Sequence, residues 1–251
     1  IIEKETLGGI CLNWGCIPTK ALLKTAQVYE DIKHSKDYGI EASGTPNFEA
    51  IIKRSRGVAD KMSKGVQFLM RKNKIDVING FGKLKAKGQI EVTAADGSKK
   101  TVEAKHIIVA TGGRSRELPS MKIDGKKIIG YREALTLSQQ PKSMIVVGSG
   151  AIGVEFGYFY NSLGTKVTIV EFMPRIVPVE DEEVSKELEK NFKKQGIAVM
   201  TSSEVTSVDT SGNGVKAKVK TPDGEVTLEA DILLSAVGVS ANIEGIGLEE
   251  L

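Results

Sequence analysis

The two cysteines of the chain, Cys11 and Cys16, lie five positions apart in the segment GGICLNWGCIPTKALLK. In a continuous α-helix, residues at this spacing are about 7–9 Å apart, whereas a disulfide needs Cα atoms about 4.4–6.8 Å apart. The two thiols can therefore join only where the backbone is tightened or irregular, and Gly15 permits such a break. Pro18 fits the first turn of a helix that follows.

Cys16 is expected at or just before the start of that helix, where the helix dipole favours a thiolate. Lys20 lies four residues further along the same helical face and adds a cation. Three interpretations compete: a pair of buried, inert thiols, a metal site, and a dithiol that cycles with its disulfide. Metal binding is disfavoured because four ligands are needed and the only histidines, His34 and His106, are distant in sequence. A cycling dithiol suits an intracellular chain best.

A second group of residues has the spacing of a dinucleotide site. Gly148, Gly150 and Gly153 form a G-x-G-x-x-G motif that follows a predicted strand and opens a predicted helix. The first glycine permits a tight turn, the second lets the backbone approach a pyrophosphate, and the third lets helix and strand pack closely. Glu171 ends the next strand, where a carboxylate can accept both ribose hydroxyls of NAD and would repel the extra phosphate of NADP. The alternative is a glycine-rich turn without a ligand, but the acid at this distance favours NAD binding.

Hydrophobic periodicity predicts the elements that position these residues. In the first half we expect a strand end before Glu3, helices over 17–33 and 48–74, a short strand at IDVING, a β-meander over 83–109 that finishes in the strand HIIVA, and a loop at TGGRSRELP. In the second half we expect helices over 131–138, 151–163 and 180–195, and strands at MIVVGSG, KVTIVE and IAVMT. Three further strands with turns at SGNG and PDG should follow, and then ADILLSAVG. The regular alternation of strand and helix after Ser143 predicts a parallel sheet covered by helices.

Composition excludes several classes of protein. The 251 residues include 35 basic and 32 acidic side chains, a net charge of +3, which offers no electrostatic case for nucleic-acid binding. No apolar run approaches the roughly 20 residues of a membrane helix, and no secretion signal is visible at IIEKETLGG. Two cysteines are too few for a disulfide-stapled secreted scaffold. These features together indicate an intracellular protein that binds neither nucleic acid nor membrane.

The segment GGICLNWGCIPTKALL closely resembles the redox-active segment of the flavin-dependent pyridine nucleotide–disulfide oxidoreductases, and the resemblance runs from Ile1 to Leu251. Within it, NWGCIPTKALL is most similar to the members that oxidise dihydrolipoyl groups with NAD+. The resemblance implies an α/β fold with two Rossmann-like nucleotide-binding domains, each with a three-stranded β-meander. We expect an incomplete FAD-binding domain with the redox-active disulfide over 1–114, a nearly complete NAD-binding domain over 115–251, and no interface domain.

The resemblance also implies which residues form the sites. For FAD it implies Glu3, which takes the place of the acid that holds the ribose, with Lys4, Gly8, Gly9, Cys11, Lys20, Gly82, Thr111, Gly112 and Gly113. For NAD it implies Gly148, Ser149, Gly150, Ala151, Ile152, Gly153, Glu155, Glu171, Val205 and Gly238. Taken alone, Gly82 and Gly112 are equally well explained as ordinary turn glycines. The segment AVGVSAN also lacks the arginine that often follows the glycine at this position in the family.

The implied catalytic residues are Cys11, Cys16, Lys20 and Glu155. In the family's mechanism, Cys11 would be the outer sulfur, which exchanges with a dihydrolipoyl substrate, and Cys16 the inner sulfur, which lies against the flavin. Electrons would then pass from the flavin to NAD+ on its opposite face. Lys20 would lie near the reactive flavin nitrogen and pair with Glu155. The alternative is that both are solvated surface charges, but a lone carboxylate within AIGVEFGYFY would be costly, which favours the pair.

Compared with the family pattern, the chain begins at the end of the second strand and stops at GLEEL, before the returning FAD segment and the interface domain. That domain carries the family's His–Glu acid/base pair, and neither His34 nor His106 has its His-Pro context, so no general base is assigned. We therefore expect a chain truncated at both ends that binds FAD weakly or not at all and has no lipoamide turnover. Residues 115–251 could still bind NAD.

The resemblance implies a protein-bound lipoyl group as partner, carried by a 2-oxo acid dehydrogenase complex or by the glycine cleavage system. It also implies a homodimer for the full-length parent, located in the cytoplasm, or in the mitochondrial matrix or plastid of a eukaryote. One alternative is another disulfide reductase similar to glutathione or mercuric reductase, although Glu171 argues against their usual preference for NADPH. The other is a non-catalytic NAD-binding fragment, or a sensor that uses the dithiol as a switch.

Overall fold

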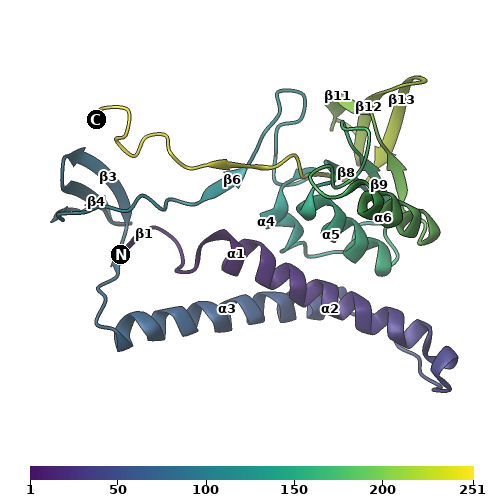
Figure 1. Cartoon of the computed structure of the whole chain (residues 1–251), viewed down its shortest axis with the longest axis horizontal. Coiled ribbons are helices and arrows are strands. Elements are labelled where there is room, and N and C mark those ends of the chain that lie inside the picture. The colour runs from purple at the N-terminus through teal and green to yellow at the C-terminus, as the bar shows by residue number, and fades with distance from the viewer.

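The computed structural model describes all residues, 1–251, and has an α/β fold with two lobes (Figure 1). Helices α2 (Cys16–Lys33) and α3 (Phe48–Lys72) run along one side of the molecule from one lobe to the other. Strands β6 (Gly113–Ser115) and β15 (Val239–Ala241) pair in antiparallel fashion and form a second connection above them. Both chain termini lie in the lobe that contains β3 and β4.

The lobe with the termini contains two small sheets. Strand β1 (Ile2–Glu3) pairs in parallel with β2 (Ile78–Asn79). Strands β3 (Phe81–Ala86), β4 (Gln89–Thr93) and β5 (Lys99–Glu103) form an antiparallel meander. The C-terminal segment returns to this meander, where the Leu84 amide donates to the Ile246 carbonyl at 2.8 Å.

The other lobe is built on a five-stranded parallel sheet in the order β10-β9-β8-β14-β7. Its strands are β7 (Ile128–Ile129), β8 (Ser143–Val147), β9 (Lys166–Val170), β10 (Ala198–Met200) and β14 (Ile232–Ser235). A second antiparallel meander consists of β11 (Glu204–Asp209), β12 (Val215–Thr221) and β13 (Gly224–Ala230). Helices α4 (Tyr131–Ala134), α5 (Ala151–Ser162) and α6 (Glu182–Lys194) complete this lobe.

The helices begin and end where their sequence provides caps. The Asn47 side chain accepts a hydrogen bond from the Ala50 amide at 2.9 Å at the start of α3, and Asp181 accepts from the Glu183 amide at 2.8 Å at the start of α6. Acidic residues occupy the first turn and basic residues the last turn of both helices, which matches the helix dipole. The 3-10 turn Ser35–Tyr38 follows α2.

The five-stranded sheet is buried on both faces, as a parallel sheet covered on both sides requires. On β8, Met144 and Val146 face a large core cluster, while Ile145 and Val147 face a second cluster formed with the meander residues Val205, Val215, Ala217 and Val219. The large cluster also contains Leu22 of α2, Ile52 of α3 and Phe156 of α5. The two halves of the sequence therefore share one hydrophobic core, which fixes α2 against α5.

The structure confirms the α/β class, the parallel sheet and both meanders, and it corrects several local predictions. HIIVA, predicted as a strand, is irregular, because no strand lies beside it to accept its hydrogen bonds and Ile108 is 91% exposed. TGGRSRELP, predicted as a loop, contains β6, which pairs with a strand distant in sequence. The helix predicted over 131–138 ends at Ala134.

Candidate functional site

The two cysteines form a disulfide at a break between two helices. Cys11 lies in the short helix α1 (Gly9–Trp14), and Cys16 is the first residue of α2. Gly15 separates the helices with φ −144° and ψ −115°, and the Cα atoms of the cysteines are 4.7 Å apart. The break that the spacing required is thus present at the glycine, and Cys16 occupies the helix start. The helix α1 was not among the predicted elements.

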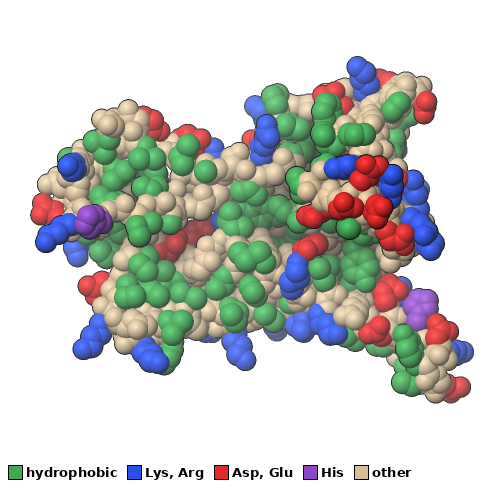
Figure 2. Space-filling model, viewed as in Figure 1, with side chains coloured by type: hydrophobic (Ala, Val, Ile, Leu, Met, Phe, Trp, Pro, Cys, Tyr) green, Lys and Arg blue, Asp and Glu red, His purple; other side chains and the backbone are tan.

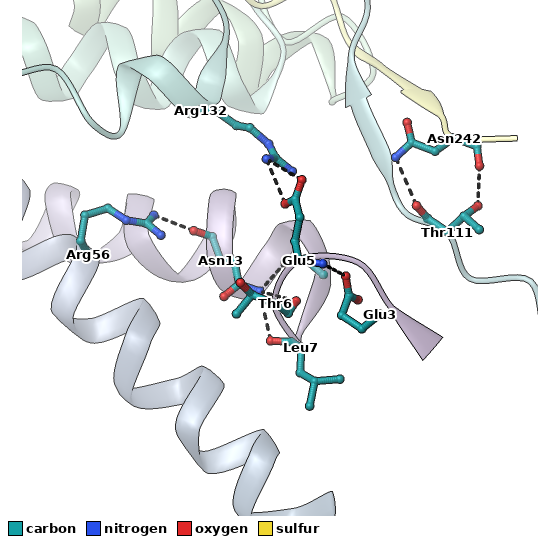
Figure 3. Close-up of polar contacts among 10 residues, drawn as sticks. Glu3, Glu5, Thr6, Leu7, Asn13, Arg56, Thr111, Arg132 and Asn242 are labelled. Carbon is teal, nitrogen blue, oxygen red and sulfur yellow. Dashed lines mark hydrogen bonds and ion pairs between the residues drawn. The ribbon is translucent and has the colours of Figure 1, made fainter. Parts of the chain in front are cut away.

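The Asn13 side chain hydrogen-bonds to the backbone of the segment that precedes Cys11 (Figure 3). Its side chain is buried, and its Nδ2 donates to the carbonyl oxygens of Leu7 at 3.1 Å and Gly9 at 3.0 Å. A third, longer contact of 3.4 Å reaches the Thr6 carbonyl. One buried amide therefore hydrogen-bonds to carbonyls where the chain enters α1, at Gly8 and Gly9, both of which have positive φ.

Helix α3 supports the segment around the disulfide through polar contacts to the backbone of α2 and of the turn before α1. The Ser55 hydroxyl donates to the Pro18 carbonyl at 2.8 Å, and the Ser63 hydroxyl donates to the Leu7 carbonyl at 3.1 Å. Both serines are buried, so these contacts satisfy groups that would otherwise destabilise the packing. Sequence patterns gave no indication of these contacts, because each joins residues that are tens of positions apart.

Lys20 and Glu155 are brought together by the packing of α2 on α5. The Lys20 Nζ and the Glu155 Oε1 are 2.5 Å apart, across 135 positions of sequence. The Lys20 side chain is 60% exposed and the Glu155 side chain 28% exposed, so the pair lies at the edge of the core. An ion pair with this exposure contributes little to stability, which leaves local orientation of the ammonium group as its main effect.

The other residues assigned to FAD occupy different places in the structure. Glu3 lies in β1, and its Oε1 accepts from the Glu5 amide at 2.8 Å, while Lys4 is exposed just after the strand. A side chain at Gly82 would contact Ile2 at 3.3 Å, so this glycine permits packing of β3 on β1.

Thr111, Gly112 and Gly113 lie beside the segment that follows β15. The Thr111 hydroxyl donates to the Asn242 carbonyl at 2.5 Å, and the Asn242 side chain donates to the Thr111 carbonyl at 3.1 Å (Figure 3). The Asn242 amide also donates to the Gly112 carbonyl at 3.0 Å. Figure 2 shows a hollow below these two paired segments, with acidic side chains inside it.

The glycine-rich turn has the geometry that its motif predicts. Gly148 has φ +97°, and a Cβ there would lie 2.5 Å from the Ala236 carbonyl oxygen. A Cβ on Gly153 would lie 2.0 Å from the Gly148 carbonyl oxygen, so only glycine allows α5 to approach the turn. A Cβ on Gly150 would meet nothing within 4 Å, which leaves the backbone at the start of α5 open, and Ala151 and Ile152 follow it in the first turn. An open helix N-terminus of this kind suits a phosphate group.

Glu171 is buried and already hydrogen-bonded to the turn. Its Oε2 accepts from the Ser149 amide at 2.7 Å and the Ser149 hydroxyl at 2.6 Å, and its Oε1 accepts from the Met173 amide at 2.7 Å. Each carboxylate oxygen has two acceptor sites, so a single site on Oε1 is left for a ligand hydroxyl. Acceptance of two ribose hydroxyls therefore requires the Ser149 hydroxyl to turn away.

The last two residues assigned to NAD differ in accessibility. Val205 is buried, and its side chain packs in the cluster between the sheet and the meander, so any ligand contact there involves its backbone. Gly238 has φ +113°, its Cβ position is open, and its carbonyl accepts from the Arg116 amide at 3.0 Å.

Comparison with known protein families matches residues 1–251 to the pyridine nucleotide-disulphide oxidoreductases. The chain belongs to this family. Among curated proteins, it is 48% identical over 270 residues to dihydrolipoyl dehydrogenase from Rhizobium etli, with 100% of the chain and 56% of that protein covered. It is 47% identical over 254 residues to dihydrolipoyl dehydrogenase from Zymomonas mobilis, with 100% of the chain and 54% of that protein covered.

A solved family structure has the same fold. The crystal structure of LpdA from Mycobacterium tuberculosis matches 100% of the chain and 55% of its own length, with a TM-score of 0.91 and 30% sequence identity. The chain thus spans about half the length of the relatives that it matches. No helix of the structure combines the length and the apolar character needed to cross a membrane.

Proposed function

We propose that the protein carrying this chain oxidises dihydrolipoyl groups with NAD+ by way of FAD and the Cys11–Cys16 disulfide. The observation that carries the proposal is the arrangement on α2: a disulfide at the helix start, and one turn later a lysine paired with Glu155 of the helix that follows the glycine-rich turn. The relatives named dihydrolipoyl dehydrogenase support the same substrate.

The residues present fit both nucleotides. For NAD, the open turn at Gly150 would take the pyrophosphate, and Glu171 would accept a ribose hydroxyl. For FAD, Glu3 offers a carboxylate at the end of β1, and Gly8, Gly9 and Gly112 have the positive φ of turns that bring the backbone close to a ligand. A bound flavin would supply two-electron transfer between a dithiol and a nicotinamide.

The chain's own residues would prepare the sulfurs and the ammonium group for that transfer. Cys16 would be the inner sulfur. It lies at the start of α2, where the helix dipole favours its thiolate. By the family resemblance, Cys11, which lies on the separate helix α1, would be the outer sulfur and would form the mixed disulfide with the substrate. Glu155 would orient the Lys20 ammonium group.

On this proposal the partner is a protein-bound lipoyl group of a 2-oxo acid dehydrogenase complex or of the glycine cleavage system. The active protein is a homodimer located in the cytoplasm, or in the mitochondrial matrix or plastid of a eukaryote. Residues 1–114 serve FAD and the disulfide, and residues 115–251 serve NAD, with β6 and β15 joining the two parts.

The proposal is tested with the protein that carries this chain, loaded with FAD. NADH formation from NAD+ should require dihydrolipoamide and should be abolished by Cys16→Ser. Lys20→Ala should slow transfer between flavin and nicotinamide, whereas Lys24→Ala, one turn further along α2 and bonded only to Gln27 at 3.1 Å, should not. Turnover of reduced glutathione without dihydrolipoamide turnover would refute the substrate, and an unchanged rate in Lys20→Ala would refute the role of the pair.

A further inference from the structure

Trp14, the only tryptophan of the chain, lies between the two cysteines in sequence and has two guanidinium groups over its ring. The Cζ atom of Arg56, from α3, is 4.2 Å from the ring centroid, and that of Arg132, from α4, is 4.8 Å away. Both distances lie within the roughly 6 Å range of a favourable cation–π contact. We call these three residues the Trp14 stack.

Arg132 also reaches the beginning of the same segment (Figure 3). Its Nη1 is 3.1 Å from Glu5 Oε2 and 3.3 Å from Glu5 Oε1. Glu5 precedes Cys11 by six positions, and Trp14 follows it by three. A single guanidinium group from the other half of the sequence therefore holds both ends of the segment 5–14, with the outer cysteine between them.

Arg56 fixes the Trp14 end from the α3 side. Its Nη1 donates to the Asn13 carbonyl at 2.6 Å. Burial lowers the pKa of Arg56, and the Asp60 carboxylate acts in the opposite direction. A guanidinium group stays charged in proteins despite such a shift, so the ring of Trp14 faces two cations.

We propose that Arg132 is a positioning residue for the disulfide, which acts through Trp14 and Glu5 to hold Cys11 against Cys16. The inference rests on the proposed function only in taking this disulfide as the bond that opens during the reaction. When the bond is reduced, the segment 5–14 keeps the geometry for closure because Arg132 still holds its two ends. Without Arg132, the reduced protein adopts that geometry for only a fraction of the time. The equilibrium constant for disulfide closure falls by the same fraction.

A positioning role and a purely electrostatic role of Arg132 predict opposite effects of Arg132→Ala on the equilibrium constant for disulfide closure. Loss of a nearby cation disfavours thiolates, which destabilises the reduced state and shifts the equilibrium toward the disulfide. Loss of positioning shifts it toward the dithiol. We expect Arg132→Ala to lower the equilibrium constant for closure by about 3- to 10-fold, the size of one cation–π contact together with one partly exposed ion pair.

The experiment equilibrates the protein with glutathione at neutral pH and counts free thiols by alkylation. In the reaction, the protein dithiol and one glutathione disulfide give the protein disulfide and two glutathione molecules, so two electrons leave the protein. Arg132→Lys keeps a cation for both contacts and should recover most of the wild-type constant. Trp14 emission should change between the oxidised and reduced wild type, and it should differ in oxidised Arg132→Ala.

Arg114→Ala is the matched control, because Arg114 forms a comparable part-exposed pair with Glu244 at 3.1 Å but makes no contact with the segment 5–14. Its closure constant should equal that of the wild type. If Arg132→Ala does not fold, Glu5→Gln replaces it and should show a smaller decrease. A folded Arg132→Ala with an unchanged or increased constant overturns the proposal, as does an unchanged constant in Glu5→Gln. The equilibrium needs neither nucleotide, so the proposed function can fail while the positioning role of Arg132 holds.

Discussion

Substitution of Gly153 by alanine tests the close approach of α5 to the glycine-rich turn. The added Cβ would lie 2.0 Å from the Gly148 carbonyl oxygen, well inside the 3.0 Å limit below which such contacts essentially do not occur. The opposing atom belongs to the backbone and cannot rotate away, so the start of α5 must shift relative to β8. Overpacking of this kind typically costs about 1–3 kcal/mol. For a domain of this size the melting temperature should then fall by about 2–12 °C.

Two glycines of the same region provide controls. A Cβ on Gly157, one turn further along α5, would contact the flexible Ile169 side chain at 3.3 Å. We expect Gly157→Ala to change the melting temperature by no more than about 3 °C, since close contact and improved helix propensity offset each other. The added Cβ of Gly150→Ala would meet nothing within 4 Å, so this variant should preserve stability but weaken NADH binding by crowding the proposed phosphate position.

The assays are thermal unfolding followed by circular dichroism and NADH titration followed by nicotinamide fluorescence. Gly153→Ala should lose both stability and NADH affinity, Gly150→Ala only affinity, and Gly157→Ala neither. Wild-type stability together with wild-type NADH affinity in Gly153→Ala would refute the packing argument.

Three further outcomes are expected. Glu171→Gln removes the negative charge from the proposed adenosine position and should reduce the ratio of NADH to NADPH affinity; an unchanged ratio in parallel titrations would show that selectivity lies elsewhere. Asn13→Ala removes the side-chain hydrogen bonds to the Leu7 and Gly9 carbonyls while Ser63 still donates to Leu7, so urea unfolding should show a loss of about 1 kcal/mol, and a loss near zero would mean that water replaces the amide. Tyr160→Phe removes the hydrogen bond of 2.6 Å to the Ala134 carbonyl and should cost about 1–2 kcal/mol. Because burial raises the pKa of Tyr160 above its ordinary value of 10.0, the wild type should keep this advantage below pH 10 and lose it as the pH rises further, and an equal deficit at all pH values would contradict this.

Local patterns predicted the parts of the fold that depend on neighbouring residues. Alternating strands and helices after Ser143 predicted the parallel sheet, and the acidic start and basic end of α6 predicted that helix. The glycine motif predicted the turn at Gly148, because the residues that allow the close backbone approach are three glycines within six positions of sequence. The spacing of Cys11 and Cys16 likewise predicted that a disulfide between them needs a break near Gly15.

Features that depend on distant partners could not be predicted in the same way. HIIVA has the composition of a strand, but a strand also needs a neighbour to accept its hydrogen bonds, and the structure provides none. Strand β6 exists because β15 pairs with it from more than a hundred residues away. The contact between Arg132 and Glu5 spans 127 positions, and neither residue belongs to a local pattern. The bond from Ser149 to Glu171 was also missed, although both residues had been assigned to the NAD site.

The most direct test of the proposed chemistry is a count of thiols before and after addition of NADH. The protein that carries this chain is loaded with FAD, mixed with NADH without oxygen, and denatured for titration with a disulfide reagent. We predict a gain of two thiols per chain, and no gain in a variant with both Cys11→Ser and Cys16→Ser. If NADH is oxidised while the thiol count of the wild type stays constant, the Cys11–Cys16 bond does not receive the electrons and the proposed function is wrong.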